Sequence, residues 1–160
     1  MQVNVTKFGD WGKAQKVLQK SSVNIYPAFE AQLQEDGELL LKTYINHIES
    51  QDLNWTPLSQ RTIELKGGDS TIYVETGYLK ENLQVVRVKI PKKVSVFIGA
   101  SSQKTTPDGI KFSDLMMWLE YGTDKIPPRP LIRPSWEEVE PIIKNNWREL
   151  LQSIIQTGDS

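Results

Sequence analysis

The sequence predicts a single α+β domain, in which a small antiparallel sheet centred on a β-hairpin at residues 83–99 packs against long N-terminal and C-terminal helices. Two long segments near the ends of the chain repeat apolar residues at the three- and four-residue spacing of a helix face. Between them lie two runs rich in β-branched residues. The chain has 160 residues, enough for one domain, which we place at 1–156 with 157–160 as a flexible C-terminal tail.

The N-terminal third is expected to form a short strand and two helices. Residues 3–8 alternate in a way that predicts the strand, and residues 11–22 have helical spacing. Pro27 suits the first turn of a second, longer helix that reaches Ile48. Gly37 interrupts the apolar stripe of this helix, at a cost of about 1 kcal/mol relative to alanine. It either permits close approach of another backbone or bends the helix.

The middle of the chain predicts short elements. Residues 54–68 have the composition of a linker, with one short turn of helix through Ile63. Residues 71–74 are expected to form a short strand, and residues 78–83 one helical turn.

The clearest strands are residues 83–90 and 94–99, which Pro91-Lys92-Lys93 joins as a tight connection. An antiparallel hairpin follows from this short connection. Side chains alternate between the faces of a strand, which predicts Val86, Val88 and Ile90 on one face and Arg87 and Lys89 on the other.

The C-terminal third is expected to contain two helices separated by an extended arm. Ser113-Asp114 is predicted to cap a helix that runs to Tyr121, with Gly122 at its C′ position. Residues 126–134 contain four prolines and are expected to be extended. Ser135 is then predicted to cap the last helix, whose apolar residues recur at helical spacing.

Composition and spacing argue against catalytic chemistry. The chain has no cysteine and one histidine, which excludes disulfides and cysteine-ligated zinc and favours a reducing compartment. His47 is expected to be an ordinary surface or boundary residue, and Lys66-Gly67-Gly68 lacks the order of a phosphate-binding loop. The acidic pairs Glu35-Asp36 and Glu137-Glu138 are expected on solvated helix faces. We therefore predict no catalytic residue, cofactor or metal ion, and no enzymatic activity.

The distribution of charge along the chain indicates which kinds of partner the protein could bind. A net charge of −1 is not typical of a protein that grips DNA, and no apolar run approaches the roughly 20 residues of a membrane helix. Counted by segment, residues 1–26 carry +3, 27–55 carry −5, 56–112 carry +4 and 113–160 carry −3. Either these are ordinary solvated faces, or they form complementary edges that dock one copy against the next. The best candidate for a polyanion site is the basic hairpin, with Arg87, Lys89, Lys92 and Lys93.

Two segments are unusual for a generic core. The first is Trp55-Thr56-Pro57-Leu58-Ser59, followed by Thr62, Lys66 and Thr76-Gly77-Tyr78-Leu79. The second is Trp118-Leu119-Glu120-Tyr121-Gly122-Thr123, followed by Pro127-Pro128-Arg129-Pro130-Leu131 and Arg133-Pro134.

In order and approximate spacing, these segments resemble the tail-completion and neck proteins of long-tailed bacteriophages, also called minor tail protein Z-like or virion-morphogenesis proteins. The resemblance runs from about Trp55 to the C-terminus. Leu131 stands where the family often has phenylalanine, and Ser135-Trp136 replaces the small residues common at the start of its last helix. The residues that carry the family pattern are Trp55, Pro57, Leu58, Thr62, Lys66, Thr76, Gly77, Leu79, Glu120, Gly122, Thr123, Arg129, Pro130 and Pro134.

The resemblance implies a structural virion protein of the head–tail junction, assembled in the host cytoplasm. Such a subunit forms or joins a ring, implied to be a hexamer, that completes the tail and connects it to the head. Implied partners are further copies of the chain, the tail tube or tail terminator, and head-closure or adaptor proteins. Genomic DNA would pass through the lumen without specific binding, and the acidic helix at 27–50 is a candidate lining. The alternatives are a tail terminator or head-closure protein of the same junction, and a nucleic-acid-binding module that uses the basic hairpin.

The proline arm is a candidate subunit interface. Leu131 and Ile132 would be its anchors, with Arg129 and Arg133 as the polar rim and Pro128 beside them. The alternative is an intramolecular connection packed within the same chain. We also expect Glu120 to form an ion pair with Arg129 that fixes the exit of the arm.

Overall fold

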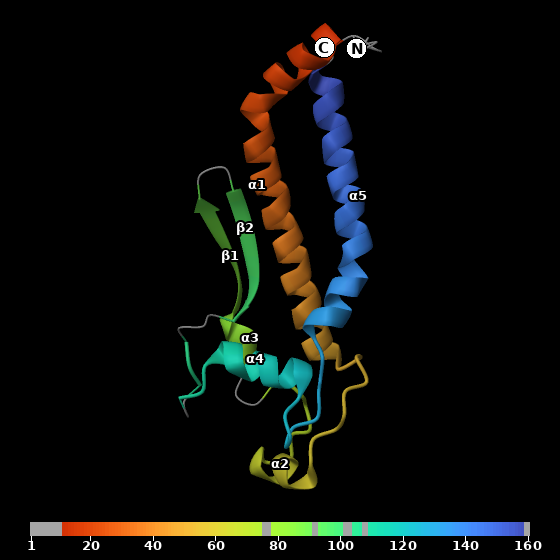
Figure 1. The fold of residues 1–160 in the computed structure, drawn as a ribbon. Helices are drawn as coiled ribbons and strands as arrows, with labels where there is room; N and C mark the ends of the chain where they lie inside the picture. The colour runs from red at the N-terminus through yellow and green to blue at the C-terminus, as the bar shows by residue number, and fades with distance from the viewer. Residues whose placement is uncertain (1–10, 75–77, 91–92, 101–103, 107–108, 159–160) are drawn as a thin grey trace, which may run out of the picture.

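The computed structural model describes residues 11–74, 78–90, 93–100, 104–106 and 109–158. It confirms the α+β class, with a two-stranded antiparallel hairpin between N-terminal and C-terminal helices (Figure 1). The strand predicted at residues 3–8 lies outside the described residues. The elements are α1 (Trp11–Ser50), α2 (Gln60–Leu65), α3 (Tyr78–Asn82), β1 (Leu83–Ile90), β2 (Lys93–Ala100), α4 (Phe112–Tyr121) and α5 (Ile132–Gly158).

The two helices predicted in the N-terminal third are one helix, α1, and the predicted break between them is wrong. Pro27 lies inside this helix and is exposed. A proline within a helix removes one backbone hydrogen bond and bends the helix without necessarily ending it. In Figure 1, the N-terminal part of α1 is inclined to the rest of the helix.

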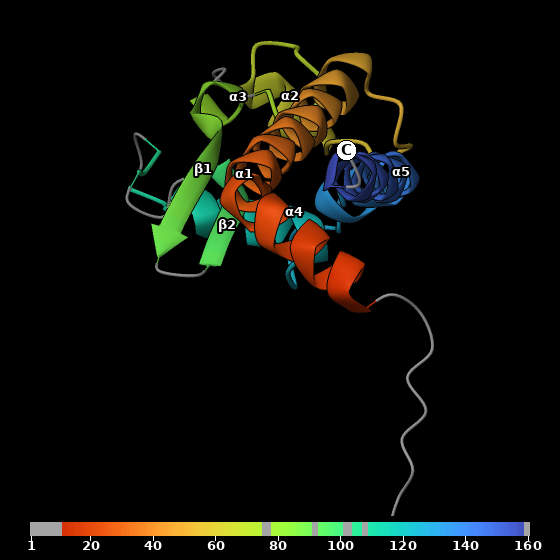
Figure 2. The ribbon, with the colours of Figure 1, turned by 90° about the horizontal axis from the view of Figure 1, so that it is seen from above.

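The long helices α1 and α5 pack side by side and run in opposite directions (Figures 1 and 2). Tyr44, Ile48 and Val139 are almost fully buried in the core that the two helices share with the base of the molecule. Farther from the base, the indole N–H of Trp147 donates to the Oδ2 atom of Asp36 over 2.6 Å, and the ring of Phe29 packs edge-on against the indole. Asp36 is thus buried, and the prediction that it lies on a solvated face is wrong.

The hairpin packs against a different side of α1 from α5 (Figure 2). Gly37 is buried at this contact, where a Cβ atom would lie 2.8 Å from Cγ1 of Val96 and 2.9 Å from Cγ1 of Val85. Of the two explanations for Gly37, the structure supports close approach. The approaching groups are side chains of the hairpin rather than backbone.

The two faces of the hairpin differ as the alternation predicts. Arg87 and Lys89 lie on the same face of β1 as Val85, toward α1, and the Nζ atom of Lys89 is 2.5 Å from Oε1 of Glu30. Val86 is on the opposite, exposed face, where its β2 neighbour is Phe97.

At the base of the molecule, the strand predicted at residues 71–74 is wrong, since no strand forms there. The side-chain amide of Gln51 accepts from the backbone N–H of Ile72 and donates to its carbonyl, at 2.9 and 3.0 Å. Because one amide satisfies both backbone groups, the segment needs no partner strand. Tyr73 has a left-handed φ of 66°, which is incompatible with an extended strand. The helical turn predicted at residues 78–83 is confirmed as α3.

The N-terminal caps predicted for the last two helices are wrong. Lys111 precedes α4 without a side-chain capping bond, so Ser113-Asp114 lies within its first turn. Ser135 lies inside α5, where its hydroxyl donates to the carbonyl of Leu131 over 2.7 Å. The predicted end of α4 is confirmed, with Gly122 at a φ of 77°. Helix α5 extends to Gly158, into the segment predicted as a tail, and residues 159–160 lie outside the described part.

Candidate functional site

At the base of the molecule, the loop after α1 meets the end of α4 and the start of α5, from which it is distant in sequence (Figure 1). Hydrogen bonds between side chains and backbone join them directly. We call Trp55, Tyr73, Glu120, Arg129 and Leu131 the motif cluster; all five are buried, with at most 8% of their surface exposed.

Trp55 anchors the loop after α1 to the proline arm. Its indole N–H donates to the carbonyl of Pro130 over 2.6 Å, across 75 residues of sequence. The ring of Tyr73 lies against the indole with centroids 5.0 Å apart, and its hydroxyl donates to the carbonyl of Arg129 over 2.6 Å. Burial, reinforced by the charge of Glu120, raises the pKa of Tyr73 well above the usual value. The two aromatic residues therefore hold consecutive carbonyls of the arm.

Arg129 is a buried cation whose side chain donates hydrogen bonds to backbone carbonyls. Its Nε atom donates to the carbonyl of Thr56 over 2.7 Å, and Nη2 donates to that of Pro57 over 3.1 Å. Its own backbone N–H donates to the carbonyl of Leu119 over 2.6 Å. Burial lowers the pKa of Arg129. The guanidinium thus ties the Trp-Thr-Pro segment to the arm by satisfying carbonyls that no helix or strand pairs.

Glu120 caps α5 instead of pairing with Arg129, so the predicted ion pair is wrong. Its Oε2 atom accepts the backbone N–H groups of Leu131 and Ile132 at 2.7 and 2.8 Å, and Oε1 accepts that of Arg133 at 3.0 Å. The first N–H groups of a helix have no partner within the helix, and its N-terminal dipole favours a negative charge. A single carboxylate therefore serves as the cap that sequence reasoning assigned to Ser135.

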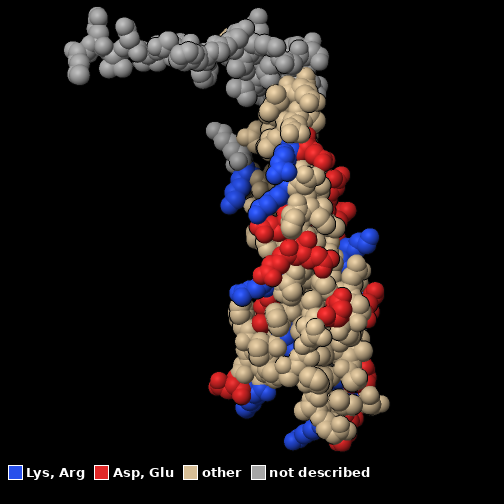
Figure 3. Space-filling model, turned by 90° about the vertical axis from the view of Figure 1, so that its right-hand side faces the viewer, with Lys and Arg blue, Asp and Glu red and all other residues tan. Residues whose placement is uncertain are grey.

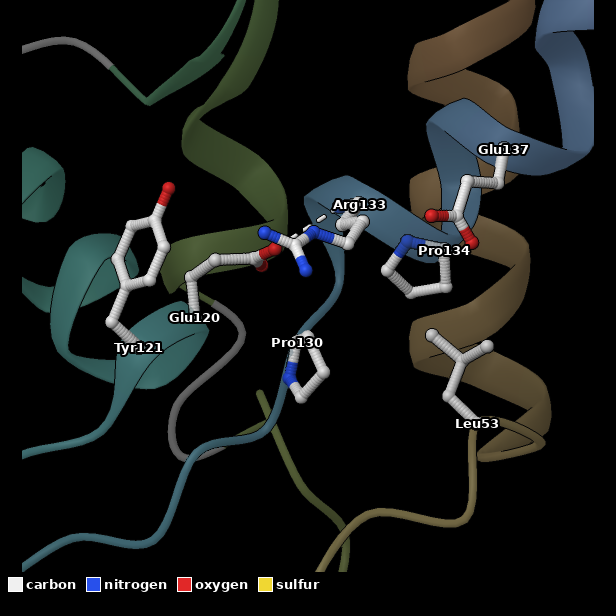
Figure 4. Close-up of a pocket in the computed structure, with 7 residues that line it drawn as sticks. All are labelled: Leu53, Glu120, Tyr121, Pro130, Arg133, Pro134 and Glu137. Atoms are coloured by element: carbon white, nitrogen blue, oxygen red, sulfur yellow. Dashed lines mark hydrogen bonds between the residues drawn. The ribbon is translucent and has the colours of Figure 1, made fainter.

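Beside the cluster lies an open pocket of about 430 Å³ (Figure 4). The side chain of Tyr121 projects at one side, while Pro130 and Pro134 form apolar walls. Both oxygens of Glu120 are engaged by the start of α5, so this carboxylate is already committed to a structural role. The lining residues are Leu53, Glu120, Tyr121, Pro130, Arg133, Pro134 and Glu137.

His47 is buried, contrary to the expectation of a surface or boundary residue. Its Nδ1 atom lies 2.7 Å from Oδ1 of Asp52, and Nε2 lies 3.2 Å from Oε2 of Glu138 without the geometry of a hydrogen bond. The hydrogen bond from His47 lowers the pKa of Asp52. The two ring nitrogens point to carboxylates on opposite sides, so His47 links α1, the following loop and α5. Within the described ranges, no group of three or more histidine and carboxylate side chains is placed to hold a metal ion.

Several other residues of the family pattern also have structural roles. A Cβ atom on Gly122 would lie 2.9 Å from the carbonyl oxygen of Ile126, so only glycine fits this turn. Thr123 accepts two backbone N–H groups in the same turn, and the buried Lys66 amine donates to the carbonyl of Thr71 over 2.5 Å. Leu79 is in the core.

The remaining positions of the pattern are less engaged or not described. The hydroxyl of Thr62 bonds with that of Ser59 in the capped first turn of α2, and Leu58 packs against the core. Thr76 and Gly77 lie outside the described residues.

Of the residues predicted to form a subunit interface, some are buried within the chain and others are exposed. Leu131 is fully buried and Arg129 almost fully, so neither can contact a second subunit in this conformation. For these two, the intramolecular alternative describes the structure. Pro128, Ile132 and Arg133 are exposed and stay candidates for an interface.

Sequence reasoning did not single out two residues that organise the base, Gln51 and Tyr73. Neither belongs to the family pattern, although Tyr73 is part of the motif cluster. Each acts on a segment that only the tertiary fold brings near. The acidic helix is also less open than expected. Glu30 and Asp36 are both engaged within the chain, which leaves Glu35 and Glu38 as exposed carboxylates on this part of α1.

Comparisons with family models, with curated proteins and with solved structures find no match to this chain. In the described part of the chain, no helix combines the length and apolar character that a membrane span requires.

Proposed function

We propose that this chain is a structural virion protein of the phage head–tail junction, a neck or tail-completion subunit that forms or joins a ring and connects the tail to the head. The observation that carries the proposal is the convergence of the family-pattern residues. Two distant segments hold each other's backbone in place, since Trp55 donates to the carbonyl of Pro130 and Arg129 donates to that of Thr56. Within the second segment, Glu120 caps the start of α5. Residues that depend on one another in this way are expected to occur together, which gives the sequence resemblance a common physical basis.

The shape and surface are compatible with this role. The molecule is elongated, with the motif cluster at one end and the N-terminal end of α1 and the C-terminal end of α5 at the other (Figure 1). The proposed partners are other copies of the chain, the tail tube or terminator, and head-closure or adaptor proteins. A hexameric ring in the virion requires two different complementary surfaces on each subunit.

A tail terminator or head-closure protein at the same junction would use similar contacts and stays the closest alternative. A nucleic-acid-binding module that uses the basic hairpin is less favoured. Lys89 is engaged by Glu30, and Arg87 lies on the same face of β1, toward α1 rather than on the open face.

The proposal is tested by light scattering and negative-stain microscopy of the purified chain, and by its binding to purified tails that lack it. Rings of about six copies, or saturable binding at one tail end, are expected. The Trp55→Phe variant tests the role of the motif cluster. It loses the hydrogen bond to Pro130 and should weaken ring formation or tail binding, because the proline arm is held less firmly. A chain that neither forms rings nor binds tails would refute the proposal.

A further inference from the structure

The outer face of the hairpin carries an exposed apolar surface. Val86, Val88, Ile90 and Phe97 expose 41–61% of their surface, while the opposite face of the hairpin packs on α1. Val86 and Phe97 are directly opposed in the register. We call these four residues the hairpin patch. Contiguous apolar surface of this kind marks contact sites on soluble proteins.

The charges of the hairpin narrow the choice of partner. Residues 83–100 contain four basic residues and no acidic residue. Lys93 pairs with Ile90 in the register, and it lies on the patch face at the end of the hairpin where the two strands are connected. Two hairpins packed face to face would bring like charges together, which is unfavourable. A partner surface that combines apolar and acidic side chains is favoured instead.

The chain itself presents such a surface on α5. Five large apolar side chains of this helix are exposed: Ile132, Trp136, Ile142, Leu151 and Ile155. The turns beside Trp136 contain three glutamates, and Figure 3 shows acidic side chains interspersed with uncharged ones on this side of the molecule. Trp136 is 42% exposed, and tryptophan is among the residues that most often dominate the energy of an interface. We call Ile132, Trp136 and Glu137 the α5 patch.

The two patches cannot meet within one chain. The hairpin and α5 lie on different sides of α1, as Figures 1 and 2 both show. A contact between them is therefore intermolecular and joins two different surfaces. Repeated from copy to copy, such a contact builds a ring or a filament rather than a two-fold dimer.

We propose that the hairpin patch of one copy docks on the α5 patch of the next, with Phe97 beside Trp136 and Lys93 near Glu137. This inference rests on the proposed ring-forming function and names the surfaces that meet. Eight residues of strand span about 27 Å, so a two-stranded face covers on the order of 300 Å² in projection. A stable interface takes about 800 Å² from each partner, so a single contact is weak and gains strength on ring closure.

Because single contacts are weak, the test traps them covalently. The chain has no cysteine, so introduced thiols are the only ones. Lys93→Cys and Glu137→Cys variants are prepared separately, mixed at high concentration and treated with a short bismaleimide. A cross-link between the two variants is expected on mixing, and the double variant is expected to give a ladder of oligomers. The control is Leu65→Cys, because Leu65 is 80% exposed in α2 and lies outside both patches.

Two further variants make the result specific. Phe97→Asp is expected to reduce the heterotypic cross-link by about tenfold, whereas Leu65→Asp leaves the yield unchanged. Both side chains are exposed, so neither change removes a buried group, and circular dichroism verifies the fold. Efficient cross-linking of Lys93→Cys with itself, equal cross-linking to Leu65→Cys, or no heterotypic product would each overturn the inference. If rings or tail binding persist in those cases, the proposed function stands and only this contact is wrong.

Discussion

The carboxylate of Glu120 receives the backbone N–H of Leu131 over 2.7 Å, at a residue with no exposed surface. This contact joins the end of α4 to the start of α5. It gives a physical reason for the acid that precedes Tyr-Gly in the sequence pattern, since a carboxylate at this position reaches backbone N–H groups at the start of α5. Glu120 therefore stabilises the fold at the start of α5, in place of the expected ion pair with Arg129.

Replacing Glu120 by alanine leaves three N–H groups at the start of α5 without their acceptor. We expect a loss of about 1–3 kcal/mol in the free energy of unfolding, measured by chemical denaturation. Glu120→Gln keeps one acceptor oxygen but loses the charge, and it should lie between the wild type and Glu120→Ala. The control is Glu137→Ala, since Glu137 lines the same pocket and is exposed. Equal stability of Glu120→Ala and the control would contradict the capping role.

Arg129→Lys tests the carbonyl contacts of the guanidinium. Lysine keeps the charge but cannot reach the carbonyls of Thr56 and Pro57 with two diverging donors. We expect a loss of about 1–3 kcal/mol in unfolding free energy, because a buried cation loses hydrogen bonds to backbone carbonyls. Arg133→Lys changes an exposed arginine four residues away and should be nearly neutral. If the two variants were equally stable, the guanidinium would not hold the arm.

Gly37→Ala tests the close contact between α1 and the hairpin. Alanine gains about 1 kcal/mol of helix propensity, yet its Cβ atom would lie under 3 Å from both Val85 and Val96. We expect net destabilisation of about 1–3 kcal/mol, because side-chain crowding in a packed contact outweighs the propensity. Gly12→Ala, at an exposed glycine of the same helix, should be neutral or stabilising.

The Val96→Ala background provides the complementary test of this contact. Removing the nearer methyl group should make Gly37→Ala less costly than it is in the wild type, which a double-mutant cycle measures. If Gly37→Ala lost the same unfolding free energy in both backgrounds, crowding against Val96 would not be the cause of the destabilisation.

The bond between Asp36 and Trp147 is expected to couple the two long helices. Trp147→Phe keeps most of the packing against Phe29 but leaves the buried carboxylate of Asp36 without its indole donor. We expect each of Trp147→Phe and Asp36→Ala to destabilise the fold by about 1–3 kcal/mol, with the double variant costing less than the sum. Additive losses would show that the hydrogen bond contributes little beyond packing. Glu35→Ala, a neighbouring exposed acid, serves as the control.

Alkaline pH should weaken the fold through two buried phenols. Burial, with the charge of Glu120, raises the pKa of Tyr44 to about 12, and the pKa of Tyr73 is raised for the same reasons. The folded state therefore retains phenolic protons that the unfolded chain releases near its ordinary pKa of about 10. This contribution to stability is complete below about pH 10 and is lost as the pH rises toward about 12.

The measurement is the free energy of unfolding as a function of pH, followed alongside tyrosinate absorbance. Tyr44→Phe and Tyr73→Phe should each make the alkaline decline shallower, because each removes one such proton. A decline of unchanged slope in both variants would rule out this linkage.

The sequence by itself determined the local elements. Strand alternation at 83–99 predicted the hairpin and its two faces, since a period of two depends only on neighbouring residues. Gly122 predicted the end of α4, because a left-handed turn there requires glycine. The long apolar stripes predicted the terminal helices, although Pro27 was mistaken for a start when it is only a bend.

Only the tertiary structure decided which polar groups meet. A serine before a helix was the natural local cap, but Glu120 reaches the start of α5 from another helix and replaces it. Similarly, Gln51, directly after α1, satisfies the backbone of Ile72, where the sequence predicted a strand. Such contacts depend on distances between segments that lie far apart in sequence, and neither propensity nor periodicity encodes these distances. The tertiary packing likewise buried Arg129 and Leu131, which in sequence are indistinguishable from the exposed residues of the same arm.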